Sequence, residues 1–503
     1  MEGPREAGEL VSGDTPQLDA EVVIAGAGFA GIGLAIQLRK RGFDSFLLLE
    51  RANDVGGTWR DNVYPGCACD IPSVLYSYSF ERNPAWTRVF PRQSELWDYL
   101  RGCVDKYRLR ERIRFGTELT EARYDEPSAT WQLRTAGGGE LRCRVLVSAM
   151  GFLNRPSIPA FPGVDRFRGP AFHTAQWDAS IDLRDKRVAM IGTGASAIQI
   201  VPEIAPIVGR LTLFQRTPPW VIPRHDAPVA VAQRAMLRRI PGYARVLRTL
   251  LYWMLEVRAY GFTVRPELLQ RREALALRHL QRQVPEAELR RALTPEYRLG
   301  CKRILLSDDY YPALRRPNAE VVTAPIAELR EDAVVTTDGV AYPADVVVFA
   351  TGFKATEGFG ALRVFGRGGA ELADAWRNGM EGYLGTTVAG FPNFFTLIGP
   401  NTGLGHNSMV VMMEAQFSYV LSALDLMRRR GIRALDVRAA IQAKFNERLQ
   451  ARMRNTVWAS GCRSWYQDAR GKNTTLWPGF TFVFRRLTRR LDPRQYELPE
   501  EPR

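Results

Sequence analysis

Two glycine-rich turns, each set between an apolar strand and a helix, constrain the fold of this chain more than any other feature. The first lies in EVVIAGAGFAGIGLAIQL, where Gly26, Gly28 and Gly31 have the spacing Gly-x-Gly-x-x-Gly. In such a turn the first glycine makes the bend, the second lets backbone approach a pyrophosphate, and the third lets helix pack on strand. The helix N-terminus attracts the phosphates. The pattern predicts a Rossmann-like dinucleotide site that includes Phe29 and Ala30.

The second turn lies in KRVAMIGTGASAIQIVPEI, with Gly192, Gly194 and Ala197 at the same spacing. The strands that follow the two turns end differently, since SFLLLE ends in Glu50 and RLTLFQRT ends in a segment that contains Arg216. An acid at this position accepts from a ribose 2′-hydroxyl, whereas an arginine binds the 2′-phosphate that an acid would repel. The second turn therefore predicts an NADP site. FAD and NADPH are the economical pair, because flavin and nicotinamide exchange hydride directly.

Two further strands that end in glycine turns, RVLVSAMGF and ADVVVFATGF, are suited to return the chain between nucleotide domains. The order of these pieces predicts an α/β fold with two Rossmann-like dinucleotide-binding domains and a helical insertion. The expected boundaries are a disordered leader at 1–20, an FAD domain at 21–155 and 385–503, and an inserted NADP domain at 156–384 whose helical insertion covers about 225–300.

The composition of the chain limits which ligands and which cellular compartment we expect for it. The net charge of +15 comes mostly from scattered arginines without a basic tail, which favours a phosphorylated small molecule over nucleic acid. Six cysteines, two of them as Cys67-Ala-Cys69, lack the spacing of a secreted disulfide framework and favour a reducing cytoplasm. No apolar run reaches transmembrane length, and no metal is expected. The best run, 246–262, contains charged residues; it is either an insertion helix packed on the domain or a helix on a membrane surface.

Six motifs occur in one order: GAGFAG, GGTWRDNVYPGCACDIPS, FRGPAFHTAQWD, GTGASA with FQRTPPW, CKRILLSDDYYP and ATGF. In this order, from about residue 21 to 490, the chain resembles the Baeyer-Villiger monooxygenases, a branch of the flavin-containing monooxygenases. The most specific family fingerprint is Phe-x-Gly-x-x-x-His-x-x-x-Trp followed by Pro or Asp. Its positions are filled by Phe167, Gly169, His173, Trp177 and Asp178.

The resemblance implies an NADPH- and O2-dependent FAD monooxygenase that inserts oxygen next to a ketone carbonyl through a C4a-peroxyflavin. A peroxide anion needs a fixed positive charge and a dry pocket. By the resemblance, Arg303 supplies that charge, Asp70 holds the arginine in place, and Lys302 is a second ligand of the 2′-phosphate. Without the resemblance, the neighbouring Lys302 and Arg303 would be interpreted as a solvated basic pair, and Asp70 as a turn residue before Pro72.

The expected cofactor contacts follow from both turns and from the resemblance. For FAD they are Gly26, Gly28, Phe29, Ala30, Gly31, Glu50, Gly57, Thr58, Trp59, Asp70, Tyr76 and Leu119. For NADP they are Gly192, Thr193, Gly194, Ala195, Ser196, Gln199, Arg216, Thr217, Lys302 and Arg303. The catalytic set is Arg303, Asp70, His173 and Trp177. His173 lies at the first crossing between the domains, where we expect a conformational joint anchored by Trp177 rather than a proton donor.

Several alternatives stay open. The helix that begins near 406–408 could direct its dipole at flavin, or simply be capped by Asn407 or Ser408. The Cys67-Ala-Cys69 pair is either packing or a strained redox dithiol. In place of ketone oxidation, the enzyme could act mainly on sulfides or amines, or be an NADPH oxidase or reductase that needs neither the His-Trp segment nor Arg303.

The expected partners are a small hydrophobic ketone and O2, with residues 460–480 bordering the active site as in relatives. No nucleic acid is expected, a weak peripheral membrane contact stays open, and the oligomeric state is not determined by the sequence.

Overall fold

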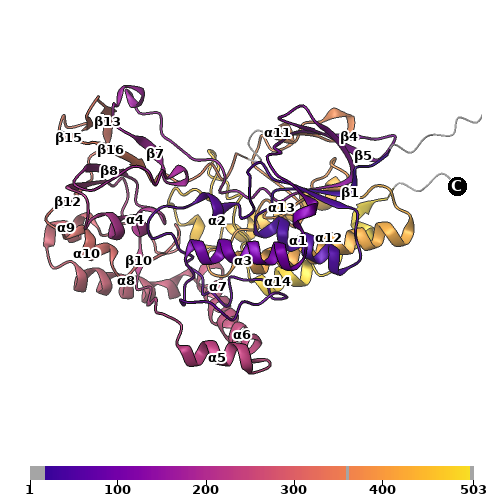
Figure 1. Cartoon of the computed structure of the whole chain (residues 1–503), viewed down its shortest axis with the longest axis horizontal. Coiled ribbons are helices and arrows are strands. Elements are labelled where there is room, and N and C mark those ends of the chain that lie inside the picture. Colours follow the sequence, from indigo (N-terminus) through magenta and orange to yellow (C-terminus); the bar gives the residue numbers. More distant parts are fainter. Residues whose placement is uncertain (1–16, 358–361, 499–503) are drawn as a thin grey trace, which may run out of the picture.

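The computed structural model describes residues 17–357 and 362–498, so most of the expected leader at 1–20 lies outside the described residues. Figure 1 shows two lobes side by side, each built on its own sheet. The first lobe contains the first and the last described elements, and the second contains those in the middle of the chain. This arrangement agrees with two dinucleotide-binding domains, one of them split by the other.

The first lobe is built on an eight-stranded mixed sheet in the order β17-β4-β5-β6-β1-β2-β3, with β18 also paired to β6. Its apolar strands β1, β2, β6 and β18 run parallel, and such strands are buried on both faces. The strands are β1 (Ala20–Ala25), β2 (Phe46–Leu49), β3 (Ile113–Arg114), β4 (Leu119–Asp125), β5 (Thr130–Thr135), β6 (Glu140–Ser148), β17 (Arg363–Phe365) and β18 (Phe394–Thr396).

Helices cover this sheet. The principal ones are α1 (Phe29–Lys40), α3 (Gln93–Lys106), α12 (Met409–Arg430) and α13 (Ala439–Met453). Shorter elements are α2 (Thr58–Asp61), α11 (Leu372–Ala375), α14 (Thr481–Leu487), β19 (Asp436–Val437) and β20 (Tyr496–Glu497). Helices α1 and α12 approach closely at Gly33, where a Cβ would lie 2.6 Å from the ring of Phe417.

The second lobe is a parallel sheet in the order β12-β9-β8-β16-β7, beside a small antiparallel sheet of β13, β14 and β15. The parallel strands are β7 (Ala171–His173), β8 (Arg187–Ile191), β9 (Arg210–Phe214), β12 (Ala319–Val322) and β16 (Val346–Phe349), flanked by α4 (Ala197–Ile204) and α10 (Tyr310–Leu314). The antiparallel strands are β13 (Ile326–Leu329), β14 (Ala333–Thr336) and β15 (Ala341–Pro343).

The return to the first lobe comes earlier than the sequence suggested. Strand β17 pairs in parallel with β4, so residues 363–365 belong to the large sheet although they precede the expected boundary at 385. A three-residue strand is too short to show a period in the sequence. The chain therefore rejoins the first lobe just after the gap at 358–361.

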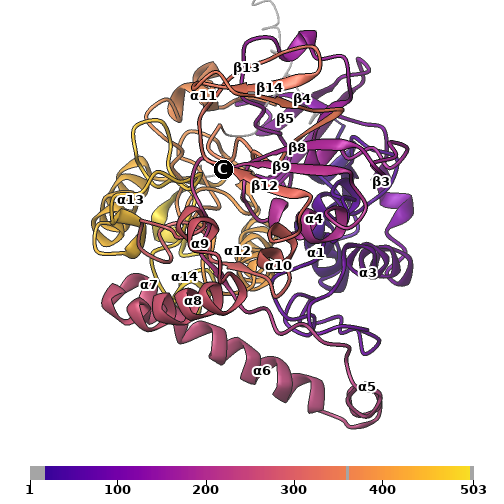
Figure 2. The same cartoon turned by 90° about the vertical axis from the view of Figure 1, so that its left-hand side faces the viewer.

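The helical insertion lies within the expected 225–300 and is bracketed by a parallel pair, β10 (Val221–Ile222) and β11 (Leu305–Leu306). Its helices are α5 (Val231–Arg239), α6 (Tyr243–Glu256), α7 (Arg258–Thr263), α8 (Gln270–Gln283) and α9 (Ala287–Ala292). Figure 2 shows α6 as a long helix along the base of the molecule, with α5 at its outer end.

One helix among the described residues, α12, is long and apolar enough to span a membrane. However, 72% of its most apolar window is buried inside the protein, where it packs on α1 and α14. Its fourteen buried side chains make it a core helix of the first lobe.

Candidate active site

The first glycine turn opens onto a cleft of about 270 Å³ between β1, β2 and the segment after β6. Gly26 has a φ of +107°, and a Cβ there would lie 2.8 Å from the carbonyl oxygen of Ala149. A Cβ on Gly31 would lie 1.9 Å from the carbonyl oxygen of Gly26. By contrast, the nearest atom to a Cβ on Gly28 is the Cα of Gly57 at 3.7 Å. The backbone is thus bare at the position that a pyrophosphate approaches.

The second turn repeats this construction. Gly192 has a φ of +108°, and its Cβ would lie 2.5 Å from the carbonyl oxygen of Ala350, whereas a Cβ on Gly194 would meet nothing within 4 Å. Ala149 and Ala350 follow β6 and β16, which lie in RVLVSAMGF and ADVVVFATGF, the two strands that the sequence marked by their own glycine turns. In both lobes, therefore, the first glycine packs on a neighbouring strand end, whereas the second is less crowded: Gly28 meets only the backbone of Gly56 and Gly57, and Gly194 faces open space.

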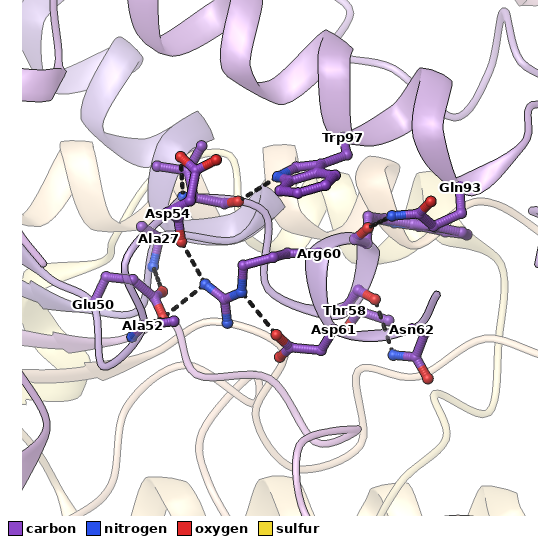
Figure 3. Close-up of polar contacts among 12 residues, drawn as sticks. Ala27, Glu50, Ala52, Asp54, Thr58, Arg60, Asp61, Asn62, Gln93 and Trp97 are labelled. Atoms are coloured by element: carbon purple, nitrogen blue, oxygen red, sulfur yellow. Dashed lines mark hydrogen bonds and ion pairs between the residues drawn. The ribbon is translucent and has the colours of Figure 1, made fainter. Parts of the chain in front are cut away.

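Glu50, at the end of β2, holds the first turn together, as Figure 3 shows. Its Oε2 accepts from the Ala27 N–H at 2.9 Å, and its Oε1 accepts from the Ala52 N–H at 3.0 Å and from Arg60 at 2.9 Å. Arg60 also donates to Asp61 and to the carbonyl of Asp54. The neighbouring acids raise the pKa of Arg60 against the opposing effect of its burial. The carboxylate at the ribose position is thus fixed and paired.

Most of the predicted FAD contacts line this cleft. They are Gly26, Gly28, Phe29, Ala30, Glu50, Gly57, Thr58, Trp59, Tyr76 and Leu119. Gly31 lies beneath the turn, and Asp70 lies in the separate cluster described below. Sequence reasoning missed Arg51, Arg60, Asp61, Met150, Asn154, Arg155, Leu362, Ile398 and Met413, which line the same cleft. Met150 lies in a segment that the sequence had marked, SAMGF, but there the prediction was a strand ending in a glycine turn rather than a cofactor contact.

Arg303 and Asp70 meet as an ion pair between the two parts of the chain. The guanidinium donates to one carboxylate oxygen of Asp70, from Nε at 2.9 Å and from a terminal nitrogen at 2.5 Å. Asp70 is the main cause of a raised pKa for Arg303, which therefore remains cationic. The buried phenol of Tyr466 lies beside the pair; burial raises its pKa to about 12, so it stays protonated. Sequence reasoning did not single out Tyr466.

Two basic side chains face one another at the end of β9. Lys302 and Arg216 are close enough for the arginine to lower the pKa of the lysine, although burial is the larger cause. Lys302 otherwise lies over the ring of Tyr297, with Nζ 4.7 Å from its centroid. Among the described residues neither cation has an ion-pair partner. Nearby, the Thr193 hydroxyl donates to the Thr217 carbonyl at 2.9 Å and joins the glycine turn to this strand end.

Gln199 does not direct its side chain into the second turn. Its amide reaches the other lobe, donating to the Ala68 carbonyl at 2.9 Å and accepting from the Tyr64 hydroxyl at 3.2 Å. The two thiols beside this contact, Cys67 and Cys69, are free and buried. Burial raises the pKa of Cys67 to about 12, whereas a reactive dithiol needs a lowered value. This environment favours the packing interpretation of the pair.

His173 ends β7 and is fully buried. Its Nδ1 accepts from the Ala175 N–H at 3.1 Å, and burial lowers its pKa. The ring packs edge-on to Phe353 with centroids 5.5 Å apart, and Trp177 packs likewise on Phe172 at 5.3 Å.

The two chain crossings between the lobes run beside each other at this point. The Ser157 N–H donates to the Gly352 carbonyl at 2.8 Å. Pro156 also forms an isolated bridge with Phe353, the residue on which the ring of His173 packs. His173 therefore lies in the second lobe next to both crossings, and Trp177 packs on Phe172 of the same strand, β7.

A disulfide between Cys301 and Cys462 joins the Lys302-Arg303 segment to the C-terminal part of the chain, with Cα atoms 6.2 Å apart. The two cysteines are 161 residues apart in sequence, so spacing gave no sign of the pair. The same C-terminal segment contains Trp465, which stacks on Phe152 at 5.9 Å, and Tyr466. Residues 460–466 thus border the site, as the sequence predicted for this region.

The N-terminus of α12 is capped by the Ser408 side chain, which accepts from the Val410 N–H at 3.3 Å. Asn407 instead donates to Glu256 of α6 at 2.7 Å, and His406 lies 3.6 Å from the same carboxylate. One turn further on, Met413 lines the cleft of the first lobe. Ordinary capping therefore accounts for Ser408, while the start of the helix lies near the cleft. No cluster of metal-ligating side chains occurs in the described ranges.

Comparison with known proteins agrees with this geometry. A model of the flavin-binding monooxygenase-like family matches residues 19–360. A Baeyer-Villiger monooxygenase of Pseudomonas aeruginosa is 49% identical over 96% of this chain and 92% of its own length. Cyclohexanone monooxygenase from Rhodococcus sp. Phi1, bound to NADP+, superposes with a TM-score of 0.87 at 28% identity, covering 96% of this chain and 99% of that one. OTEMO in complex with FAD and NADP gives a TM-score of 0.86 at 28% identity, covering 94% and 97%.

Proposed function

The chain belongs to the Baeyer-Villiger monooxygenases, within the flavin-binding monooxygenase-like family, and from this premise we propose how its residues divide the reaction. It is an NADPH-dependent FAD enzyme that inserts one oxygen atom next to a ketone carbonyl. Ketone, O2, NADPH and a proton give ester or lactone, water and NADP+. When bound, FAD accepts hydride from NADPH and supplies activated oxygen.

We assign FAD to the cleft of the first lobe. Its pyrophosphate would lie against Gly28 and the N-terminus of α1, where the backbone is bare and donors are directed outward. The adenosine ribose would lie at Glu50, whose carboxylate is already oriented by two backbone N–H groups. Thr58, Trp59 and Tyr76 would form the far wall; the Trp59 indole N–H donates to the Tyr76 hydroxyl at 3.3 Å.

We assign the 2′-phosphate of NADPH to Arg216 and Lys302. Two cations without acid partners repel each other. A dianion between them would remove that repulsion and would also offset the cost of burying the charged Lys302. The bare position at Gly194 would receive the pyrophosphate. Arg216 comes from the strand end and Lys302 from the far side of the insertion, so the phosphate would join them.

The Arg303–Asp70 pair is the observation that carries the catalytic proposal. A permanently charged guanidinium, shared with a single carboxylate oxygen, keeps donor N–H groups for a second acceptor. Arg303 would stabilise negative charge on the attacking oxygen and then on the former carbonyl oxygen of the ketone. Asp70 would position it, and Tyr466 would shield the charge from water.

His173 and Trp177 would serve as the joint between the lobes. Support comes from the packing of His173 against Phe353, beside the point where the two crossings exchange hydrogen bonds. A lowered pKa keeps the imidazole neutral, which suits packing better than proton transfer.

The substrate that we propose is a bulky, hydrophobic ketone, handled in the cytoplasm. Tyr466 belongs to an apolar cluster that includes Phe262, Trp458, Leu476 and Trp477, so the surroundings of Arg303 on this side lack charge.

A ketone panel tests the reaction. Purified holoenzyme is mixed with linear, cyclic and bulky ketones, NADPH and air, and products are identified by mass. We expect esters or lactones 16 mass units above the ketone, in proportion to the NADPH consumed. Consumption of NADPH with hydrogen peroxide as the sole product, or oxygenation of sulfides alone, would overturn the assignment.

A further inference from the structure

Exposed apolar side chains are concentrated on one part of this molecule. Of the eighteen large hydrophobic residues that are exposed in the described ranges, eleven lie between 231 and 275 and two more lie on α14. Scattered single residues of this kind are ordinary, but a contiguous exposed patch marks an interaction surface. In Figure 2, α5 and α6 of this part stand out at the base of the molecule.

The patch follows one face of α6 and continues into α7. We call it the apolar arm face; its residues are Val246, Leu250, Trp253, Met254, Val257 and Tyr260, with exposed fractions between 42% and 68%. Their spacing is that of a single helical stripe. The opposite face of α6 is buried through Tyr252, Leu255 and Glu256. The helix is therefore apolar on both sides, and only one side has a partner in this chain.

The arm face extends onto α14. The ring of Trp253 lies 6.0 Å from that of Phe482, which is itself 43% exposed. Arg486 follows Phe482 by four residues and so shares its side of the helix.

The charges around this patch are mostly positive. Between residues 231 and 275 the chain has nine arginines and three acids, Glu256, Glu267 and Glu273. Of these acids, Glu256 is buried and accepts hydrogen bonds from Thr481 and Asn407, so it presents no charge to solvent. Exposed arginines flank the patch at 238, 239, 245 and 486, and none of the four has an ion-pair partner within the described ranges.

We propose that the apolar arm face docks on the surface of an anionic phospholipid bilayer. Tryptophan and aliphatic side chains insert at the boundary between headgroups and acyl chains, while flanking arginines bind lipid phosphates. A second copy of this chain fits less well, because a symmetric contact would bring the two sets of arginines together. Helix α6 has 14 residues and spans about 21 Å, too short to cross a bilayer, so it lies in the plane of the surface.

The position of α6 and α7 suggests what the membrane contact does for the enzyme, an inference that rests on the proposed function. On its inner side, Phe262 of α7 packs against Trp458 with ring centroids 6.0 Å apart. A Cβ on Gly300, three residues before Arg303, would lie 3.1 Å from the same Phe262 ring. The helix pair that meets the membrane thus borders the site on its other face. A hydrophobic ketone dissolved in the bilayer would enter from there.

Vesicle sedimentation tests the docking directly. FAD-loaded enzyme is centrifuged with vesicles of phosphatidylcholine and phosphatidylglycerol at 3:1, and with phosphatidylcholine alone. We expect binding to the anionic vesicles that weakens as salt is raised, and little binding to the neutral ones. Leu250→Gln with Val257→Gln should weaken binding about tenfold or more through lost apolar burial. Arg238→Gln with Arg239→Gln should weaken it by a similar factor.

The matched control is Ile207→Gln with Val340→Gln, which removes the same number of exposed apolar residues, 47% and 46% exposed, from the second lobe. It should bind like the parent, and all variants should turn over a water-soluble ketone at the parental rate. Absence of binding to anionic vesicles, or equal binding by the arm and control variants, would overturn the proposal. So would a dimer in solution that the arm variants convert to monomer, because the face would then join two copies. Failure of ketone turnover with intact vesicle binding would contradict only the proposed function.

Discussion

Arg303 and Asp70 are 233 residues apart in sequence, and the arginine donates two hydrogen bonds to a single carboxylate oxygen of the acid. Asp70 comes from the segment between α2 and α3 of the first lobe, whereas Arg303 follows the insertion of the second. The position of the positive charge at the site therefore depends on how the two lobes sit against each other.

Replacing Arg303 should separate the two halves of the reaction. In Arg303→Ala, NADPH should still bleach the flavin under nitrogen, but ester formation should fall about 10²–10³-fold, because the fixed charge is lost. Asp70→Asn should cause a smaller fall, since the guanidinium remains but is less well held. Stopped-flow absorbance and product mass measure the two steps. Ester at normal yield from Arg303→Ala would show that another group stabilises the oxyanion.

Removing Arg216 should affect NADPH and leave NADH almost unchanged. Loss of a charged hydrogen bond to the 2′-phosphate should raise the NADPH KM about 10–100-fold in Arg216→Ala. Lys302→Ala should act in the same direction. The control is Arg210→Ala at the start of β9, the strand that leads to Arg216, and this variant loses only an exposed pair with Glu320. An unchanged ratio of NADPH to NADH efficiency would place recognition of the phosphate elsewhere.

His173→Ala should lower the amount of ester formed per NADPH consumed, whereas the rate at which NADPH reduces the flavin should stay the same. Without the ring between β7 and Phe353, the lobes would be held less firmly during the oxygen step, and more NADPH would be consumed per ester. The ratio of product to NADPH, with hydrogen peroxide measured alongside, reports this. An unchanged ratio of ester to NADPH would exclude the role of His173 as a joint between the lobes. Loss of flavin reduction by NADPH under nitrogen would instead indicate that His173 takes part directly in the chemistry.

The Cys301–Cys462 disulfide should make the site region sensitive to thiols. Closing a loop of this length restricts the unfolded chain, so Cys301→Ser with Cys462→Ser should lose about 2–4 kcal/mol of unfolding free energy. Dithiothreitol should destabilise the parent similarly and leave the double variant unaffected. Thiol titration under denaturing conditions should count four reactive thiols before reduction and six after. Six before reduction would show that the pair is open in the purified enzyme.

Asp436 should give the first lobe a pH-dependent stability. Burial raises its pKa to about 6, against the opposing charge of Arg367. The folded state therefore holds this proton more tightly than the unfolded one. The stability from this group is fully present below about pH 4 and is lost as pH rises through 6, by up to about 3 kcal/mol. Asp436→Asn should lack that change, so the difference between the two proteins in chemical denaturation should vary with pH. A constant difference would refute the shift.

The turns were predictable because each carries its own local signature. Gly26 and Gly192 need a positive φ and a close backbone neighbour, and only glycine permits both. The strand ends at Glu50 and Arg216 follow at a fixed interval, so fold class, cofactors and domain order could be derived from spacing together with the family resemblance.

Contacts between distant segments could not be derived in this way. Nothing local marks Tyr466 as a neighbour of Arg303, or directs Gln199 to Ala68 across the lobes. Cys462 pairs with Cys301 only because the C-terminal segment folds back over the insertion. Likewise β17 is three residues long and is defined by its partner β4 rather than by its own pattern.

Because the second lobe is inserted into the first, the two lobes can complete their folds only in a fixed order while the ribosome makes the chain. Strand β18, which pairs with β6, and helix α12, which packs on α1, lie roughly 250 residues or more beyond those partners. At about 5–20 residues per second, the ribosome delivers them about 12–50 s after β6 has emerged. The second lobe has all its sheet strands once β16 is made. The domain that the chain begins first is thus the last that it can finish, and the end of β6 (Leu146–Ser148) has an open edge until β18 pairs with it.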